Sequence, residues 1–232
     1  MSTETGPLLA SGRDGDIFEF GPGRVLRRAK NGRVIENEAR IIAYAREHGY
    51  PVPEIYDVRE GGTEIVMQRI EGPIMADAML KRPRLMPRLV RELADLHDRL
   101  HVIPAPDWLP DLGGDRLVHL DLHPLNVMMT ASGPIVIDWT NAARGEPLLD
   151  VAVTYVLLTC PRFPGSDLLN RALGPVRQLL GRTFTKRYRG PDLDRQLVIG
   201  AGLKTLDAHM SADEVAAIER VAAQAQARIA RS

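Results

Sequence analysis

Three polar residues in the middle of the chain have the types and the spacing needed for metal and phosphate chemistry. Asp121 and Asn126 belong to the segment 119–126, which reads His-Leu-Asp-Leu-His-Pro-Leu-Asn, and Asp138 directly follows the run Ile-Val-Ile at 135–137. Carboxylate and amide oxygens are hard ligands, which suit Mg²⁺ and bind softer metals poorly. We therefore predict that this part of the chain handles Mg²⁺.

The flanking segments predict a β-hairpin. Residues 127–129 (Val-Met-Met) and 135–137 are short apolar runs, and Ala-Ser-Gly-Pro at 131–134 predicts the turn between them. A hairpin of this kind would bring Asp121, Asn126 and Asp138 close together.

The order of these residues resembles the catalytic loop of kinases, His-x-Asp-x-x-x-x-Asn, followed by an Asp at the end of the next strand. Leu120 stands where ordinary protein kinases have Arg, and 137–139 reads Ile-Asp-Trp instead of Asp-Phe-Gly. Asp-Leu-His-Pro-x-Asn together with Ile-Asp-Trp is similar to the aminoglycoside phosphotransferase and choline kinase group. The resemblance implies an α+β, two-lobed protein-kinase-like fold. Residues 1–70 would form a small β-rich lobe with one helix, and residues 71–232 a mainly helical lobe with the catalytic hairpin.

The resemblance also assigns roles around the hairpin. Asp121 would be the catalytic base. Asn126 and Asp138 would hold Mg²⁺ against the phosphates of ATP. His123 would either donate a hydrogen bond near the transferred phosphoryl group or pack the loop.

The family pattern has an Asp-Leu-Ala-like segment at 148–152, where Asp150 would hydrogen-bond the backbone of the catalytic loop and hold it rigid. The start of a helix also favours an acid through the helix dipole, which is compatible with that role. His119 is likewise expected to support the site rather than to act on a substrate. His97 falls near the apolar face of the helix predicted over 86–101 and is expected to be structural.

A glycine-containing loop near the N-terminus lies between the strands predicted at 8–10 and 17–20. Gly12 and Gly15 would let backbone amides approach the phosphates of a nucleotide. The spacing is not Gly-x-Gly-x-x-Gly, and Asp14 and Asp16 would repel phosphate if they pointed inward, so an ordinary hairpin turn remains the alternative.

The next predicted strand carries the cation that kinases place beside the phosphates. The family's apolar-Leu-Arg pattern selects Arg27, and strand alternation puts Arg28 on the opposite face. A guanidinium can grip phosphate and carboxylate in bidentate fashion. The fold also needs a glutamate from the following helix to hold the cation, and Glu38 is preferred over Glu36. Solvated strand arginines, and acids placed by the helix dipole, are the alternatives.

Two further strands, at 55–58 and 64–70, are joined at Gly61-Gly62 and lead to a predicted lobe boundary. In kinase folds the crossing segment offers its backbone to adenine. The resemblance therefore places Met67 at the back of the nucleotide pocket. It assigns adenine binding to the backbone of Gln68, Arg69 and Ile70.

Composition limits the class of protein. The chain has 30 Lys plus Arg and 30 Asp plus Glu, and the resulting zero net charge disfavours nucleic-acid and membrane-surface partners. The single cysteine excludes an internal disulfide, and the longest apolar run, 151–158, is too short to span a bilayer. No signal sequence is recognised, so a cytoplasmic location is expected. The sequence leaves the oligomeric state open.

Three functions fit these observations. The first is an ATP- and Mg²⁺-dependent phosphotransferase acting on a hydroxyl of a small molecule. The second is an atypical small protein kinase, which the short helical lobe favours and the His-Pro loop opposes. The third is a non-catalytic nucleotide-binding regulatory protein, which the arginine in place of lysine and the acidic, irregular glycine loop favour.

The number of acidic side chains around the acceptor pocket indicates which class of acceptor it can bind. A polycationic aminoglycoside needs clustered acidic side chains. The segments expected to form the acceptor pocket hold a moderate number of acids, namely Asp107, Asp111 and Asp115 before the catalytic loop and Asp192, Asp194 and Asp207 after Gly190. We therefore expect a small hydroxyl-bearing metabolite rather than an aminoglycoside.

Overall fold

The computed structural model describes residues 5–12, 14–162, 166–208 and 210–231. Contacts divide the chain into two compact units, one formed by residues 1–77 and 125–140 and the other by 78–124 and 141–232. The hairpin, which the sequence assigns to the second lobe, thus has its contacts in the first unit. The Met129 amide donates to the Pro73 carbonyl and the Val136 amide donates to the Pro51 carbonyl, both at 2.8 Å.

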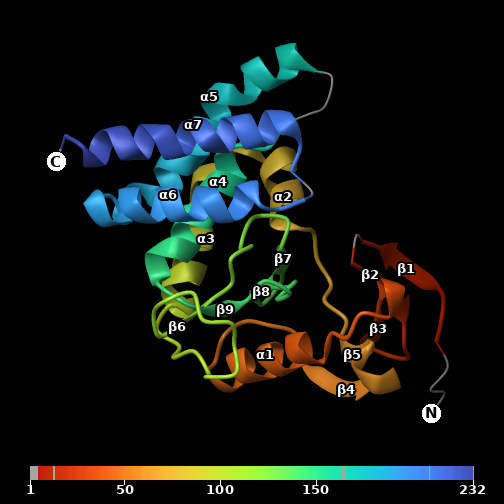
Figure 1. Ribbon diagram of the computed structural model, residues 1–232. Coiled ribbons are helices and arrows are strands. Elements are labelled where there is room, and N and C mark those ends of the chain that lie inside the picture. The colour runs from red at the N-terminus through yellow and green to blue at the C-terminus, as the bar shows by residue number, and fades with distance from the viewer. Residues whose placement is uncertain (1–4, 13, 163–165, 209, 232) are drawn as a thin grey trace. The chain divides into compact units, whose positions relative to one another are not determined.

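The first unit is built on a five-stranded antiparallel sheet with the order β1-β2-β3-β5-β4 (Figure 1). Its strands are β1 (Leu8–Ser11), β2 (Gly15–Glu19), β3 (Arg24–Ala29), β4 (Ile55–Arg59) and β5 (Glu64–Gln68). Short 3-10 turns occur at Lys30–Gly32 and Glu60–Gly62.

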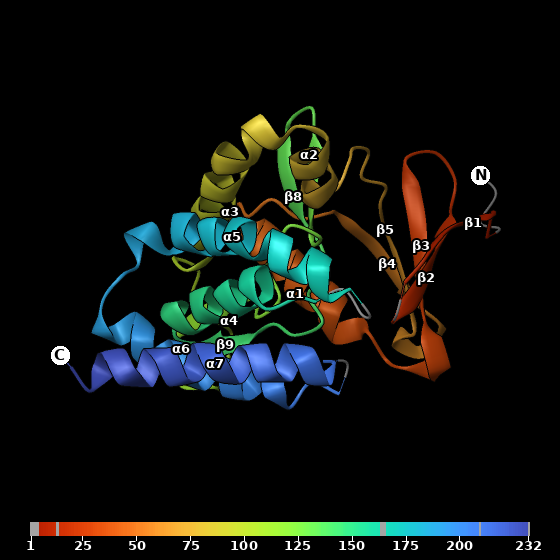
Figure 2. The same cartoon turned by 90° about the horizontal axis from the view of Figure 1, so that it is seen from above.

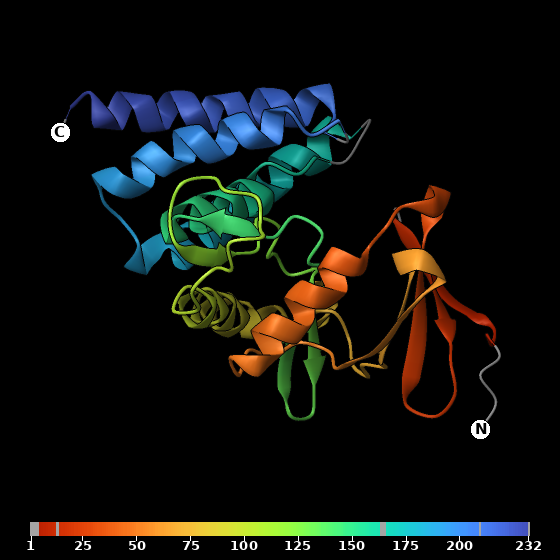
Figure 3. The ribbon, with the colours of Figure 1, turned by 60° about the horizontal axis from the view of Figure 1, so that its bottom comes forward.

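Helix α1 (Glu36–Glu47) packs against β4 and β5 of this sheet (Figure 3). Ala39, Ile42 and Ala45 recur at helical spacing and are buried, which explains both the helix and the face it presents. Gly49 follows with a φ of +75°, a left-handed conformation that suits glycine just after a helix end.

The hairpin consists of β7 (Val127–Thr130) and β8 (Gly133–Val136). The predicted four-residue turn is too long: Gly133 pairs with Thr130 and Pro134 with Met129, so only residues 131–132 remain between the strands. An edge strand tolerates Pro134, because the missing amide can face away from the ladder.

The second unit is mainly helical. Its helices are α2 (Met75–Lys81), whose start belongs to the first unit, α3 (Met86–Leu100), α4 (Pro147–Thr159), α5 (Asp167–Phe184), α6 (Pro191–Thr205) and α7 (Ala212–Ile229), with 3-10 turns at Pro83–Leu85 and Thr185–Arg187. Helices α6 and α7 run side by side, and α4 packs against α6 (Figures 1 and 2). Among the described residues, no helix combines the length and apolarity needed to cross a membrane.

Two short strands in the second unit join the catalytic loop to the segment after the hairpin. β6 (Arg116–Val118) pairs in antiparallel fashion with β9 (Ala143–Gly145). β9 lies in the segment between the hairpin and α4. Ala-Arg-Gly has no apolar alternation, and its extended conformation depends on the pairing with β6.

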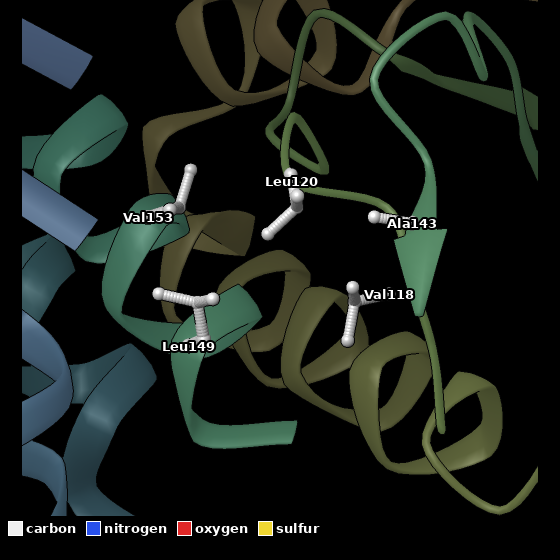
Figure 4. Close-up of a cluster of buried hydrophobic side chains, with 5 residues drawn as sticks. All are labelled: Val118, Leu120, Ala143, Leu149 and Val153. Carbon is white, nitrogen blue, oxygen red and sulfur yellow. The ribbon is translucent and has the colours of Figure 1, made fainter. Parts of the chain in front are cut away.

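A small apolar cluster lies at the start of the loop 119–126 (Figure 4). It consists of five buried side chains from the loop, β6, β9 and α4, namely Val118, Leu120, Ala143, Leu149 and Val153. Leu120 immediately precedes Asp121 and has a φ of +60°, which is unusual for a branched non-glycine residue. Packing of its side chain therefore helps to hold a strained backbone beside the candidate base.

Candidate active site

The predicted site residues fall into two groups, one in each unit. The first unit contains Arg27, Glu38, Asn126 and Asp138, together with the glycine loop and the 67–70 segment. The second contains His119, Asp121, His123 and Asp150. Each group has its own geometry.

A buried ion pair dominates the group in the first unit. The guanidinium of Arg27, on β3, pairs with Glu38 of α1, and their side chains are only 11% and 4% exposed. The other Glu38 carboxylate oxygen accepts a hydrogen bond from the Thr140 hydroxyl at 3.3 Å. Burial lowers the pKa of Arg27, and the negative charge of Asp138 opposes that change. A guanidinium is always protonated in proteins, so Arg27 is a cation within electrostatic reach of the candidate metal ligand.

Arg28 and Glu36 do not take part in this pair. Arg28 lies on the other face of β3, 45% exposed, where its Nε donates at 2.6 Å to Glu64, its cross-strand neighbour. Strand alternation accounts for the difference between the two arginines, because successive side chains point to opposite faces.

Asn126 and Asp138 stand at adjacent ends of the hairpin strands. The Ile137 amide donates to the Asn126 carbonyl at 3.0 Å, which holds the two segments together. Asp138 has a φ of +63°, a left-handed conformation that is uncommon outside glycine and concentrates at functional sites.

This donor set fits Mg²⁺ bound together with a phosphate. Among the described residues, no group of three or more His, Cys, Asp or Glu side chains is arranged to hold a metal ion. One carboxylate and one amide therefore need further oxygens from phosphate and water, which is how Mg²⁺ is usually bound.

The glycine loop closes on itself. The Gly12 amide donates to the Gly15 carbonyl at 2.9 Å, and Lys30 Nζ donates to the Gly12 carbonyl at 2.7 Å. Lys30 also lies 3.4 Å from Asp16, so that acid has a counter-charge. A Cβ on Gly15 would stand 2.8 Å from the Arg28 carbonyl, so close strand packing alone requires glycine there.

The segment predicted to bind adenine uses part of its backbone in the sheet. Met67 is buried, at the end of β5. The Gln68 amide donates to the Glu54 carbonyl at 2.8 Å and the Arg69 amide to the Gly23 carbonyl at 2.9 Å. The Gln68 and Arg69 amides are therefore used within the protein. Of the three amides predicted to bind adenine, that of Ile70 is the best candidate.

Asp121, in the second unit, lies between two basic side chains. Its Oδ1 accepts a hydrogen bond from Lys204 Nζ at 3.1 Å, and its Oδ2 lies 3.6 Å from His123 Nε2. Burial by itself would raise the pKa of Asp121, but His123 and Lys204, with a smaller contribution from His119, lower it to about 2. The carboxylate is thus ionised and ready to accept a proton or a hydrogen bond.

The backbone of the loop before Asp121 is held by Asp150, in the first turn of α4. The fully buried Asp150 carboxylate accepts hydrogen bonds from the His119 amide at 3.1 Å and from the Leu120 amide at 2.7 Å. It also accepts from His101 Nε2 at 3.0 Å. Burial alone would raise the pKa of Asp150, but these partners and the nearby imidazoles hold it well below its usual range.

The loop after Asp121 is held by a second buried network. The Thr154 hydroxyl lies 2.8 Å from the Leu122 carbonyl and 2.9 Å from His97 Nε2, and His97 Nδ1 donates to the Leu93 carbonyl at 2.8 Å. Burial lowers the pKa of His97 to about 4, so the ring is neutral at pH 7. Its role is structural, as the helical pattern predicts.

Four residues of these networks were not predicted from the sequence: His101, Thr140, Thr154 and Lys204. Three of them lie in ordinary helical or loop surroundings and give no signal. Lys204 does give a signal, because it directly follows the uncharged run of small and apolar residues at 197–203. A lone lysine in such a run suggests a buried partner of opposite charge.

The chain resembles known proteins in its sequence. A profile of the APH phosphotransferase enzyme family matches residues 5–116 and 107–182, well over half of the chain. The sequence is also 30% identical over 122 residues to a probable serine/threonine-protein kinase BUD32 homolog of Archaeoglobus fulgidus. That match covers 51% of this chain and 52% of the relative, so the chain spans about half the length of the curated relative it matches.

Solved structures share the fold. A thermostable mutant of aminoglycoside phosphotransferase APH(4)-Ia, in ternary complex with AMP-PNP and hygromycin B, has a TM-score of 0.61 at 18% identity, over 98% of this chain and 93% of that chain. A choline/ethanolamine kinase family protein from Mesorhizobium loti has a TM-score of 0.59 at 15% identity, over 97% and 90%. The predicted α+β, protein-kinase-like fold is confirmed.

Proposed function

The chain belongs to the phosphotransferase enzyme family, and from this premise we propose that it transfers the γ-phosphoryl group of ATP to a hydroxyl of a small molecule. The observation that carries the proposal is the ionised Asp121 on a backbone that buried partners hold in place. A protein that only bound nucleotide would have no need of a carboxylate positioned in this way.

The first unit supplies the nucleotide side of the proposed reaction. Arg27, held by Glu38, would neutralise phosphate charge, and a guanidinium can do so with two parallel hydrogen bonds. Asn126 and Asp138 would hold Mg²⁺, which would supply positive charge to offset that of the phosphates. The backbone at 67–70, through the Ile70 amide, would bind adenine. The AMP-PNP complex of the aminoglycoside phosphotransferase neighbour supports ATP as the donor.

The second unit supplies the acceptor side. The acceptor oxygen would attack the γ-phosphorus, forming one oxygen–phosphorus bond. The bond from that phosphorus to the bridging oxygen breaks, and ADP leaves with the electron pair. The hydroxyl proton passes to Asp121. A carboxylate with a pKa near 2 is a weak base, so it would mainly orient the hydroxyl and take the proton late.

A protein kinase activity is the second candidate. The similarity to the BUD32 homolog favours it, although that similarity covers half of each protein. The Asp-Leu-His-Pro-x-Asn motif and the structural similarity to small-molecule kinases favour a small acceptor instead.

The test is an ATP turnover assay with small alcohols and generic protein substrates, using wild type and Asp121→Asn. We expect transfer to small hydroxyl compounds only. The variant should lose about 10²- to 10⁴-fold in rate and keep its ATP affinity within a few-fold, because a base acts mainly in the transition state. Asp213→Asn, which changes an exposed acid at the start of α7, is the control. An equal collapse of ATP affinity in Asp121→Asn would instead make Asp121 a binding or structural residue.

A further inference from the structure

A lysine from a helix distant in sequence donates a hydrogen bond to one oxygen of the candidate base. Lys204 lies near the end of α6, and its Nζ donates to Asp121 Oδ1 at 3.1 Å. The two side chains are 11% and 20% exposed. The other oxygen of Asp121 faces His123, so both oxygens are directed to basic groups.

This contact has a consequence when an acceptor arrives. A hydroxyl that donates its hydrogen bond to Oδ1 lies beside the Lys204 ammonium and weakens the hydrogen bond from Lys204, because the two donors share the lone pairs of one oxygen. A largely buried ammonium whose carboxylate partner is weakened is costly unless another anion compensates it. A neutral acceptor offers no replacement, and a cationic acceptor adds repulsion.

Five of the six acids expected near the acceptor pocket contact other groups. Asp107 pairs with Arg144 at 3.2 Å, and Asp115 pairs with Arg116 at 3.2 Å. The acids at the start of α6 pair with Arg195 and with Arg228. Asp111 caps its own turn by accepting from the Gly113 amide at 2.9 Å. Four of these acids thus already have an arginine as counter-ion, whereas a lysine contacts the candidate base directly.

We propose that Lys204 is a specificity-determining residue that selects an acceptor carrying an anionic group, such as a carboxylate or phosphate, close to the hydroxyl that is phosphorylated. The anionic group takes over the Lys204 ammonium and releases Asp121 Oδ1 to the hydroxyl. This inference rests on the proposed phosphotransfer and names its substrate class. The transfer itself is balanced as above: the acceptor proton goes to Asp121 and ADP leaves.

The test compares acceptors that differ in charge and little else. One set is glycerate, glycerol and 3-amino-1,2-propanediol; a longer set is gluconate, glucitol and 1-amino-1-deoxyglucitol. Phosphoryl transfer and the shift in Tm on binding are measured with Mg²⁺ and ATP, or with AMP-PNP for the Tm. The proteins are wild type, Lys204→Met, Lys204→Arg and, as control, Lys186→Met, which removes an exposed cation of the same unit.

In wild type we expect the hydroxy acids to give the highest kcat/KM and the largest Tm shift. In Lys204→Met, the ratio of kcat/KM for anionic acceptors to kcat/KM for neutral acceptors should fall by about 10- to 100-fold. This is the range expected for the loss of one charge-assisted hydrogen bond. Lys204→Arg should recover part of that ratio, and Lys186→Met should leave it unchanged. If Lys204 were only structural, its replacement would lower kcat/KM for all acceptors by the same factor.

Three outcomes would overturn the inference. They are a wild-type preference for neutral or cationic acceptors, an equal loss for all acceptors in Lys204→Met, and no anion-specific Tm shift in wild type. Failure of the proposed function is distinguishable, because it appears as no transfer to any acceptor, whereas the Tm measurement still decides the role of Lys204.

Discussion

The two units stabilise their charged site residues in different ways. In the first unit, Arg27 and Glu38 form a direct pair between neighbouring elements, and Arg28 pairs with Glu64. In the second unit, Asp121 and Asp150 each have several partners, which come from the loop 119–126 and from helices distant in sequence. Strand alternation separates Arg27 from Arg28, and the family pattern selects Glu38 as the partner of Arg27. The side-chain donors Lys204 and His101 could not be predicted in this way, because they lie 83 and 49 residues from the carboxylates they contact.

The difference suggests different tasks. A single counter-ion keeps a cation in place for a phosphate that brings its own charge. Several donors around one carboxylate instead fix the backbone of a short loop, including the left-handed Leu120. We therefore expect mutations in the first unit to affect nucleotide use, and mutations behind the loop in the second unit to affect stability as well as rate.

The largest effect should come from Asp138→Ala. Removal of the candidate metal ligand should abolish Mg²⁺-dependent ATP turnover while the protein remains folded, because the partly exposed Asp138 has no packing role comparable to that of a core residue. Turnover and circular dichroism measure the two parts. Asp57→Ala, which removes an exposed acid of the same unit, is the control. Undiminished transfer by Asp138→Ala would remove Asp138 from the site.

Asp150→Asn should destabilise the second unit. The amide would replace an anion that accepts three hydrogen bonds, and the loss of a buried charged partner costs about 3–5 kcal/mol. Urea unfolding measures the change. Asp213→Asn, at the start of α7, should cost no more than about 1 kcal/mol, the size of a helix-dipole interaction. Equal costs for the two variants would mean that Asp150 only serves the helix dipole.

His97 should make the second unit sensitive to mild acid. Its pKa is about 4 in the folded protein and 6.5 ordinarily, so below pH 6.5 the unfolded state binds more protons and stability falls as the pH falls. The expected loss is about 2 kcal/mol between pH 7 and pH 5. The low pKa values of Asp121 and Asp150 act only below this range. Urea unfolding at several pH values should show a flatter dependence for His97→Gln than for wild type.

The control for this titration is His48→Gln, which changes an exposed histidine of the first unit. It should leave the pH dependence as in wild type. A wild-type stability that does not change between pH 7 and pH 5 would show that His97 is not held neutral.

The smallest expected effect is the difference between Arg27→Ala and Arg28→Ala in the KM for ATP. Arg27→Ala should raise the KM for ATP by about 10-fold or more, in line with the loss of one charge-assisted interaction of about 1.5–3 kcal/mol. Arg28→Ala should change it little, because Arg28 is half-exposed and pairs with Glu64 on the other face. Steady-state kinetics decide the ranking. The reverse ranking would place the phosphates on the opposite face of β3.

The sequence by itself was sufficient for features that depend on neighbouring residues. Alternation along β3 separates Arg27 from Arg28, and the apolar runs around 127–136 predict the hairpin. Periodicity acts over a few residues, so the local pattern determines these features.

Only the tertiary structure decided what surrounds the catalytic loop. The β6–β9 pairing, the association of the hairpin with the first unit and the contact of Lys204 with Asp121 all join segments that are distant in the chain. Such contacts depend on how helices and strands pack, and the free energy of packing is not encoded in the spacing of any one segment. The candidate site residues, with Glu38 and Asp150 as partners, could therefore be named from the sequence and its family resemblance, whereas Lys204 and His101 could not.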